Sequence, residues 1–133
     1  MSREDNPQEW LRLAENDRRV ARLLLADGEY DTCAFHCQQA VEKLLKAIIV
    51  KQTGQAPPYI HDLRPLFRLA DTAGADENVA VAINGLNVYY AATRYPMDTV
   101  DADAFIKPLA ESAVKQTEMV FTWFFPKVNF GNK

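Results

Sequence analysis

The sequence predicts an all-α protein, an up-and-down bundle of about five helices joined by short links. Apolar residues recur every three or four positions in successive segments, and no segment shows the period-of-two alternation of a strand. Glycine or proline separates the segments. A chain of 133 residues fits one domain, so we expect residues 1–133 to form a single helical domain with its core in about residues 8–125.

The longest predicted helix covers residues 30–52, and the rest of the chain is organised around it. Its apolar or small residues at helical spacing are Tyr30, Cys33, Ala34, Cys37, Ala40, Val41, Leu44, Leu45, Ile48 and Ile49. Its polar residues are Asp31, Gln38, Gln39, Glu42, Lys43 and Lys46. This pattern predicts one packed face and one solvated face, with His36 near the seam and Asp31 as the N-cap. Glu42 precedes Lys46 by one helical turn, which favours the helix.

The same periodicity predicts four other helices, at about residues 8–26, 62–73, 77–92 and 102–125. Pro7 and Pro65 fall in first turns, where proline is tolerated, and Asp76 is a predicted N-cap. Gly85 lies inside a predicted helix at a cost of about 1 kcal/mol relative to alanine. A glycine there indicates close helix packing or a local bend.

Three polar or reactive residues fall on apolar helix faces. An unpaired carboxylate on such a face is costly, so we expect Asp17 to find a hydrogen-bonding partner or to lie at the edge of the apolar stripe. Cys33 and Cys37 lie four residues apart on one face, and the chain has no other cysteine. We expect both to be buried free thiols.

Composition and charge restrict the classes of function. No run approaches the ~20 apolar residues of a membrane span, and residues 1–7 lack the apolar core of a secretory signal. We therefore expect a soluble cytoplasmic protein with no membrane partner. The net charge of −3 argues against an overall electrostatic footprint for nucleic acid. Basic residues in the first two helices alternate with acidic ones, which is typical of a solvated, ion-paired surface.

A metal site and a serine triad both lack residues of the right kind. His36 and His61 are the only histidines, and His36 has no carboxylate at the three-or-four spacing that a helical metal site needs, only Gln39, which is a poor ligand. Ser2 is terminal and Ser112 lies inside a predicted helix, which suits neither for the nucleophile of a triad. We expect no metal and no cofactor.

One group of residues has the chemistry of a binding site. His61 and Asp62 stand at a predicted helix start, and Tyr89, Tyr90, Arg94 and Tyr95 stand at a predicted helix end. Guanidinium groups pair with phosphate and aromatic faces stack on bases. The alternative is a structural corner in which Arg94 pairs with Asp62 or Asp98. The candidate ligand-binding residues are Arg94, Tyr95, Tyr90, His61, Asp62, Gln39 and Lys43.

Three motifs in order along the chain resemble those of the HEPN domain family. They comprise Tyr30, Phe35, Gln38, Gln39, Ala40, Glu42, Leu45, Lys46 and Ala47, then Pro58 and His61-Asp62-Leu63, then Thr93-Arg94-Tyr95-Pro96. The resemblance covers about residues 8–125. It implies an up-and-down helical bundle, usually a homodimer, often encoded beside a small nucleotidyltransferase as a toxin–antitoxin pair. The aromatic-rich segment Phe121, Trp123, Phe124 and Phe125 also favours a homodimer.

Many members of that family are metal-independent ribonucleases that use an arginine followed, four to six residues later, by a histidine. Arg94 matches the arginine, but the positions of the histidine hold Thr99, Val100 and Asp101. Without that imidazole the usual general acid and base for RNA cleavage is missing. We therefore expect a protein that binds a nucleotide or a nucleotidyltransferase partner without cleaving RNA. A ribonuclease toxin with a rearranged site, using Arg94 and His61, and a structural dimeric adaptor are the alternatives.

Overall fold

The computed structural model describes residues 3–94 and 106–128, and for residues 92–94 it describes the backbone alone. The helices are α1 (Pro7–Ala26), α2 (Tyr30–Thr53), α3 (Leu63–Ala70), α4 (Glu77–Asn87), α5 (Tyr89–Arg94) and α7 (Lys107–Phe124), with short 3-10 helices η1 (Arg3–Asp5) and η3 (Phe125–Val128). The described part of the chain contains no strand. The prediction of an all-α fold is confirmed.

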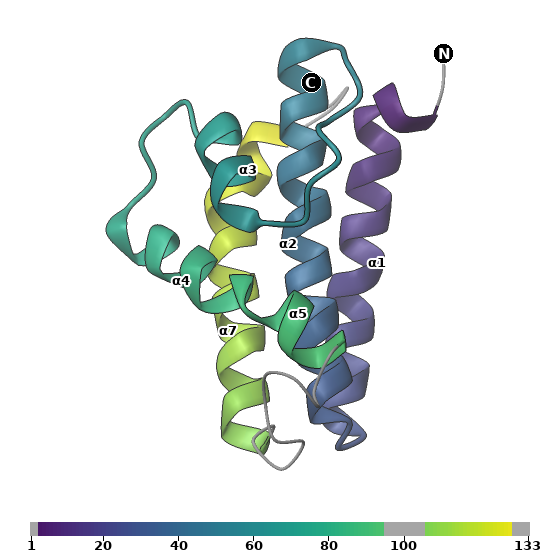
Figure 1. Ribbon diagram of the computed structural model, residues 1–133, viewed down its shortest axis with the longest axis vertical. Helices are drawn as coiled ribbons and strands as arrows, with labels where there is room; N and C mark the ends of the chain where they lie inside the picture. Colours follow the sequence, from purple (N-terminus) through teal and green to yellow (C-terminus); the bar gives the residue numbers. More distant parts are fainter. Residues whose placement is uncertain (1–2, 95–105, 129–133) are drawn as a thin grey trace.

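Three long helices, α1, α2 and α7, run along the long axis of the molecule (Figure 1). α2 packs against both α1 and α7. The shorter helices complete the bundle, because α3 and α5 pack on α2 and α4 packs on α7. None of the described helices is long and apolar enough to cross a membrane.

The core is built around α2, as the periodicity predicts. Its side chains are buried almost without interruption from Ala40 to Val50. α7 adds Phe121 and Phe124, which are among the largest fully buried side chains. Each such side chain contributes roughly 2–3 kcal/mol on burial. Cys33 and Cys37 are free and fully buried, so the prediction of two buried thiols is confirmed.

The prediction of a solvated face on α2 holds for the exposed Asp31 and is wrong for three of its other polar residues. Gln38, Glu42 and Lys46 are 0%, 3% and 5% exposed. α1, α3, α5 and α7 all contact α2, so the bundle covers this helix on more than one side. The three buried polar residues satisfy one another by pairing. Nζ of Lys46 lies 3.0 Å from Oε2 of Glu42, and Nε2 of Gln38 donates to Oε1 of Glu42 at 3.3 Å.

Two helix ends differ from the prediction. α3 stops at Ala70, because Asp71 leaves the helical conformation and its Oδ2 accepts from the backbone N of Ala75 at 2.8 Å. The predicted helix at 77–92 is two helices, α4 and α5, separated at Val88. Oδ1 of Asn87 accepts from the backbone N of Leu63 at 2.7 Å, which joins the end of α4 to the start of α3.

Two helix starts also differ. The N-cap of α2 is Glu29, and Asp31 lies in its first turn, where its Oδ1 accepts from the backbone N of Thr32 at 2.8 Å. α7 begins at Lys107, and Ile106 before it has an extended backbone. The prediction of a helix from residue 102 onward is therefore wrong at Ile106. The predicted positions 102–105 lie outside the described residues. Asp76 is the N-cap of α4 as predicted, although its side chain makes no capping hydrogen bond.

Candidate functional site

The buried carboxylate of Glu42 is the centre of a polar cluster. Its side chain is 4% exposed, and its Oε2 lies 3.0 Å from Nζ of Lys46 and 3.1 Å from Nδ1 of His61. Its Oε1 accepts from Nε2 of Gln38 and of Gln39, both at 3.3 Å. A buried charge is tolerated when it is paired and hydrogen-bonded in this way. We refer to these five residues as the Glu42 cluster.

His61 is the most exposed member of the Glu42 cluster. It precedes α3, and its backbone carbonyl accepts from Nε2 of Gln38 at 3.1 Å. Its side chain is 48% exposed and stacks on the ring of Tyr90, with centroids 4.4 Å apart and planes at 12°. Because Nδ1 faces the Glu42 carboxylate, the imidazole is oriented by a hydrogen bond on one edge and by Tyr90 on one face.

Asp62 next to His61 is held by Arg64. Nε and Nη2 of Arg64 bind the two carboxylate oxygens at 3.0 and 2.7 Å. Oδ1 also accepts from the backbone N of Arg64, which caps α3. The hydrogen bonds from Arg64 lower the pKa of Asp62 to about 2. The structural alternative for this corner was a pair between Asp62 and Arg94. The described partner of Asp62 is Arg64.

A second polar cluster joins α1 to α2 around Asp17. Its carboxylate accepts from Nζ of Lys43 at 2.6 Å and lies 2.8 Å from Nδ1 of His36. The Asp17 side chain is 8% exposed, so it is a buried carboxylate with two partners. The expectation that Asp17 finds a hydrogen-bonding partner is confirmed. We refer to Asp17, His36 and Lys43 as the Asp17 cluster.

Aromatic rings connect the two clusters along one side of α2. The rings of His36 and Phe35 meet edge to face with centroids 5.6 Å apart, and those of Phe35 and Tyr90 are 6.2 Å apart. Tyr90 then stacks on His61. In both clusters, therefore, Nδ1 of the histidine faces a buried carboxylate that also binds a lysine. Imidazole, phenol and amide groups can together hold a planar polar ligand.

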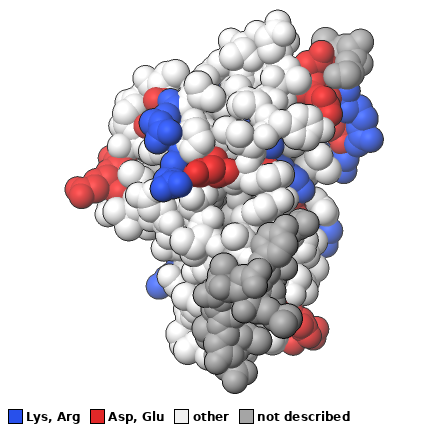
Figure 2. All heavy atoms as spheres, viewed as in Figure 1, with Lys and Arg blue, Asp and Glu red and all other residues white. Residues whose placement is uncertain are grey.

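The described surface offers no extended basic area on the face that carries α3, α4 and α5. Figure 2 shows small basic and acidic groups beside one another on that face. Among the described residues, no group of three or more histidine, cysteine, aspartate or glutamate side chains could hold a metal ion.

Comparisons with known proteins identify the family. The family model for the HEPN domain matches residues 7–128. The chain belongs to the HEPN domain family. Two solved structures have a similar fold, and no curated protein matches the chain.

The two solved structures resemble this HEPN domain over nearly its whole length. TT1696 from Thermus thermophilus is 26% identical with a TM-score of 0.82, and the match covers 91% of this chain and 97% of that one. ST0689, described as an archaeal HEPN homologue, is 19% identical with a TM-score of 0.75, over 93% of this chain and 98% of that one. The second likeness shows the fold alone.

The structure brings some of the predicted site residues of this HEPN domain together. His61 and Tyr90 are stacked, and Gln39 reaches the same carboxylate as His61. Lys43 is bound to Asp17 instead. The backbone of α5 ends at Arg94, four positions after Tyr90, and the side chain of Arg94 lies outside the described structure. Tyr95 and the positions 99–101 also lie outside the described residues.

Sequence reasoning missed Glu42 as the residue that joins the site. Its spacing indicates only a partner of Lys46 on a solvated face. The available signal was the position of Glu42 between apolar residues, because Val41 and Leu44 flank it closely in a helix expected at the centre of the core. Charged residues in such a helix are buried only when paired, and His61 is the partner that no local pattern indicates.

Proposed function

We propose that this HEPN domain binds a nucleotide at the Glu42 cluster and does not cleave RNA. The observation that carries the proposal is the half-exposed imidazole of His61, held by Glu42 and stacked on Tyr90. A fixed imidazole beside a phenol offers a hydrogen-bonding edge and an aromatic face for the base or the sugar of a nucleotide.

Arg94 supplies the charge that such a ligand needs. It ends the same short helix that Tyr90 helps to begin, and a guanidinium binds phosphate through parallel hydrogen bonds. Thr99, Val100 and Asp101 stand where the family's ribonuclease motif has a histidine. Binding without cleavage is the expected result, because the chain has the arginine of the motif, Arg94, and lacks its histidine.

We also propose a homodimer and a nucleotidyltransferase-type partner, together forming a toxin–antitoxin type of pair in the cytoplasm. The apolar residues that suggested the dimer are only partly available, because Phe121 and Phe124 are 1% and 0% exposed. Phe125 and Met119 remain 40% and 42% exposed. Buried free thiols fit a reducing compartment.

A metal-independent ribonuclease is the second candidate function. It is favoured by the pairing of His61 with Glu42, since a carboxylate that orients an imidazole prepares it for proton transfer. His61 would then replace the missing histidine, and Arg94 would stabilise the phosphate charge.

One set of variants tests these functions. Wild type, Arg94→Ala, His61→Ala and the matched control Arg68→Ala, an exposed arginine of α3, are assayed by calorimetry with mononucleotides, by RNA cleavage without metal, and by thermal melting. We expect the wild type to bind a nucleotide, Arg94→Ala to weaken binding about ten-fold or more, and Arg68→Ala to bind as the wild type does. We expect no cleavage.

Other results would reject the proposal in distinct ways. Metal-independent cleavage that disappears in both Arg94→Ala and His61→Ala would establish the ribonuclease. No nucleotide binding, with a lowered melting temperature in Arg94→Ala, would indicate a structural arginine in an adaptor. Co-purification from the native host, with the neighbouring gene product as the first candidate, tests the partner.

A further inference from the structure

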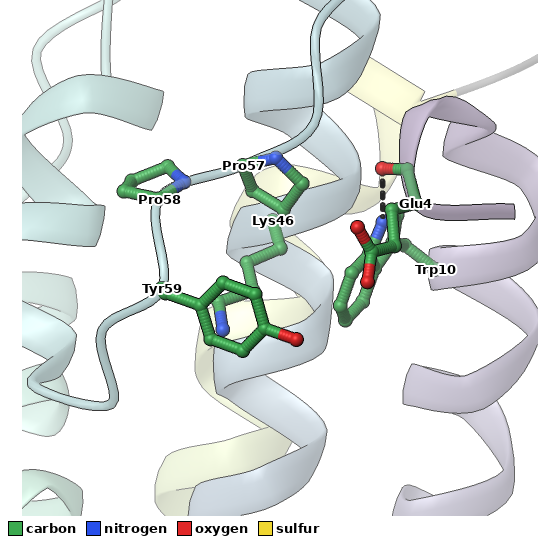
Figure 3. Close-up of a pocket in the computed structure, with 6 residues that line it drawn as sticks. All are labelled: Glu4, Trp10, Lys46, Pro57, Pro58 and Tyr59. Atoms are coloured by element: carbon green, nitrogen blue, oxygen red, sulfur yellow. Dashed lines mark hydrogen bonds between the residues drawn. The ribbon is translucent and has the colours of Figure 1, made fainter. Parts of the chain in front are cut away.

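We propose that a small cavity between Trp10 and Tyr59 binds a planar heteroaromatic ring of the nucleobase type. The cavity measures about 70 Å³. Its lining comes from four elements, with Glu4 in η1, Trp10 in α1, Lys46 in α2 and the link residues Pro57, Pro58 and Tyr59. Figure 3 shows the side chains of Trp10, Lys46 and Tyr59 around it. The inference rests on the proposed nucleotide binding and assigns a place to the base.

One wall of the cavity is already fixed in position. Nε1 of Trp10 donates to the backbone carbonyl of Glu4 at 2.9 Å, which holds the indole in place (Figure 3). The ring packs against the core as a partly buried side chain, so one part of it remains accessible. A fixed aromatic face binds a second ring at little cost in conformational entropy.

The opposite wall is an aromatic residue that the core does not use. Tyr59 is 88% exposed. The two prolines before it restrict the backbone, and the backbone N of Ile60 donates to the carbonyl of Pro58 at 3.0 Å. The link therefore presents the phenol ring at the mouth of the cavity on a restrained backbone. Its side-chain torsions remain free to close over a ligand, and a tyrosine loses little entropy in doing so.

The cavity also contains a hydrogen-bond donor. The side chain of Lys46 is 6% exposed, and its Nζ lies 3.0 Å from Oε2 of Glu42 and 5.5 Å from the centre of the Trp10 ring. An ammonium group has three donors, and the described structure gives this one a single hydrogen-bond acceptor. A ring with a carbonyl oxygen or an unprotonated nitrogen on its edge provides a second acceptor.

Charge selects a neutral ring over a free anion. The charges of Lys46 and Glu42 oppose one another, and Glu4 adds a carboxylate to the lining. The Glu4 carboxylate would repel a phosphate in the cavity, and the Lys46 ammonium is already paired with Glu42, whereas a neutral base with acceptor atoms meets no such repulsion. An aromatic pair beside a carboxylate can also hold an organic cation. The Lys46 ammonium disfavours that occupant.

The cavity is connected to the site of the proposed function through one atom. Lys46 and His61 both bind Oε2 of Glu42, at 3.0 and 3.1 Å. Tyr59 and His61 are also two residues apart in the same link. A base that accepts from Lys46 is therefore linked through the Glu42 carboxylate to the imidazole that is proposed to contact the rest of the nucleotide.

The test uses nuclear magnetic resonance of the two indole N–H groups in the full chain. The probes are adenosine and uridine, which carry a base without phosphate, ribose 5-phosphate, which carries phosphate without a base, and choline. A Trp123→Phe variant assigns the Trp10 signal. We expect the nucleosides to shift the Trp10 signal and leave that of Trp123 in place, and we expect no shift from ribose 5-phosphate or choline.

Two variants of an exposed residue complete the experiment. Tyr59→Ala should weaken nucleoside binding about five-fold or more, and Tyr59→Phe should retain it, because stacking needs the ring. Arg68→Ala, at an exposed arginine of α3, should leave nucleoside binding unchanged. If mononucleotides bind by calorimetry while nucleosides leave Trp10 unchanged, or if Tyr59→Ala has no effect, the cavity assignment is wrong and the proposed function stands. If choline alone shifts Trp10, the cavity is a cation site and the assignment is again wrong. If neither nucleosides nor nucleotides bind, both proposals fail.

Discussion

Arg18 of α1 binds Glu118 of α7 through two parallel hydrogen bonds, from Nε to Oε2 at 2.8 Å and from Nη2 to Oε1 at 2.5 Å. The two residues are 100 positions apart in the chain. The guanidinium also lies 4.7 Å from the centre of the Phe121 ring. Paired side chains of this kind are stronger than single surface ion pairs, because both hydrogen bonds are charge-assisted and the arginine is packed.

The first prediction concerns how much the pair of Arg18 and Glu118 stabilises the protein as the pH falls. Hydrogen bonds from Arg18 lower the pKa of Glu118 in the folded protein. A depressed carboxyl pKa stabilises the fold above the unfolded-state pKa, and this stabilisation is lost as the pH falls through the folded-state pKa. We expect Glu118→Gln to lower the free energy of unfolding by about 1 kcal/mol at pH 7. Between about pH 5 and pH 3 the wild type should lose more stability than the variant.

Thermal melting across this pH range measures the difference. Glu111→Gln is the matched control, because Glu111 is an exposed glutamate of the same helix. Equal acid sensitivity of wild type and Glu118→Gln would show that the pair does not contribute to acid stability.

The second prediction concerns the buried carboxylate of the Asp17 cluster. Asp17→Asn leaves Nζ of Lys43, now 2.6 Å from Oδ2, without an anionic partner at a site that is mostly buried. We expect a loss of about 3 kcal/mol in the free energy of unfolding, measured by urea denaturation. Asp27→Asn, at an exposed aspartate just after α1, should change it by less than about 0.5 kcal/mol.

A double variant separates the unpaired charge from the lost packing. Asp17→Asn combined with Lys43→Met removes both charges, so it should recover part of the stability lost by Asp17→Asn alone. If the double variant is as unstable as the sum of the two single variants, the two side chains do not interact energetically.

Periodicity predicted the helices because it is a local property of the chain. The first helix was placed within one residue of its start and at its observed end, since Pro7 and Gly28 mark its limits. Gly28 has a φ of 79°, a left-handed conformation that glycine adopts without strain. Val88 carries no such local mark. The break there accompanies the hydrogen bond from Leu63 to Asn87, which joins residues 24 positions apart.

Burial of Glu42 and Lys46 on the polar side of α2 could not be predicted from local pattern. Glu42 and Lys46 have the spacing of a surface ion pair, and the same spacing serves a buried one. Whether water reaches them depends on α3, α5 and the link before α3, which fold back over α2. The chemistry of a predicted helix start and a predicted helix end placed His61 and Tyr90 in one candidate group, and the structure stacks their rings. The joining role of Glu42 depends on a contact with His61, 19 positions away.

The third prediction concerns Gly85, which the sequence marked as a point of close helix packing or of a local bend. A Cβ at this position would lie 2.6 Å from Nε2 of Gln116 in α7. Alanine favours a helix over glycine by about 1 kcal/mol, but here the Gln116 side chain must move first. We expect Gly85→Ala to be neutral or destabilising in the wild type. In a Gln116→Ala background the same change should stabilise by about 1 kcal/mol.

A double-mutant cycle by urea denaturation measures this coupling. Ala82→Gly, on the same helix, measures what a glycine costs in α4. Its effect also includes the buried area that is lost with the methyl group of Ala82. Stabilisation of about 1 kcal/mol by Gly85→Ala in the wild type itself would show that Gln116 moves aside at no cost.

The last prediction concerns the proton on His61. Because Nδ1 faces the Glu42 carboxylate at 3.1 Å, the neutral imidazole should carry its proton on Nδ1 and leave Nε2 as an acceptor toward a ligand. Long-range ¹⁵N–¹H correlation spectra distinguish the two nitrogens directly. In Glu42→Gln the charged acceptor is lost, so we expect a mixture of the two tautomers and a loss of roughly 3 kcal/mol from the unpaired Lys46.

His36 provides the internal comparison, since its Nδ1 lies 2.8 Å from the Asp17 carboxylate and is separate from the Glu42 cluster. Its signals should also report a proton on Nδ1, and they should stay unchanged in Glu42→Gln because Asp17 is untouched. In Asp17→Asn the pattern should reverse, with His36 altered and His61 retained. A proton on Nε2 of His61 in the wild type would mean that Glu42 does not orient this imidazole. The proposed acceptor toward the ligand would then be absent, and nucleotide binding would have to use His61 as a donor.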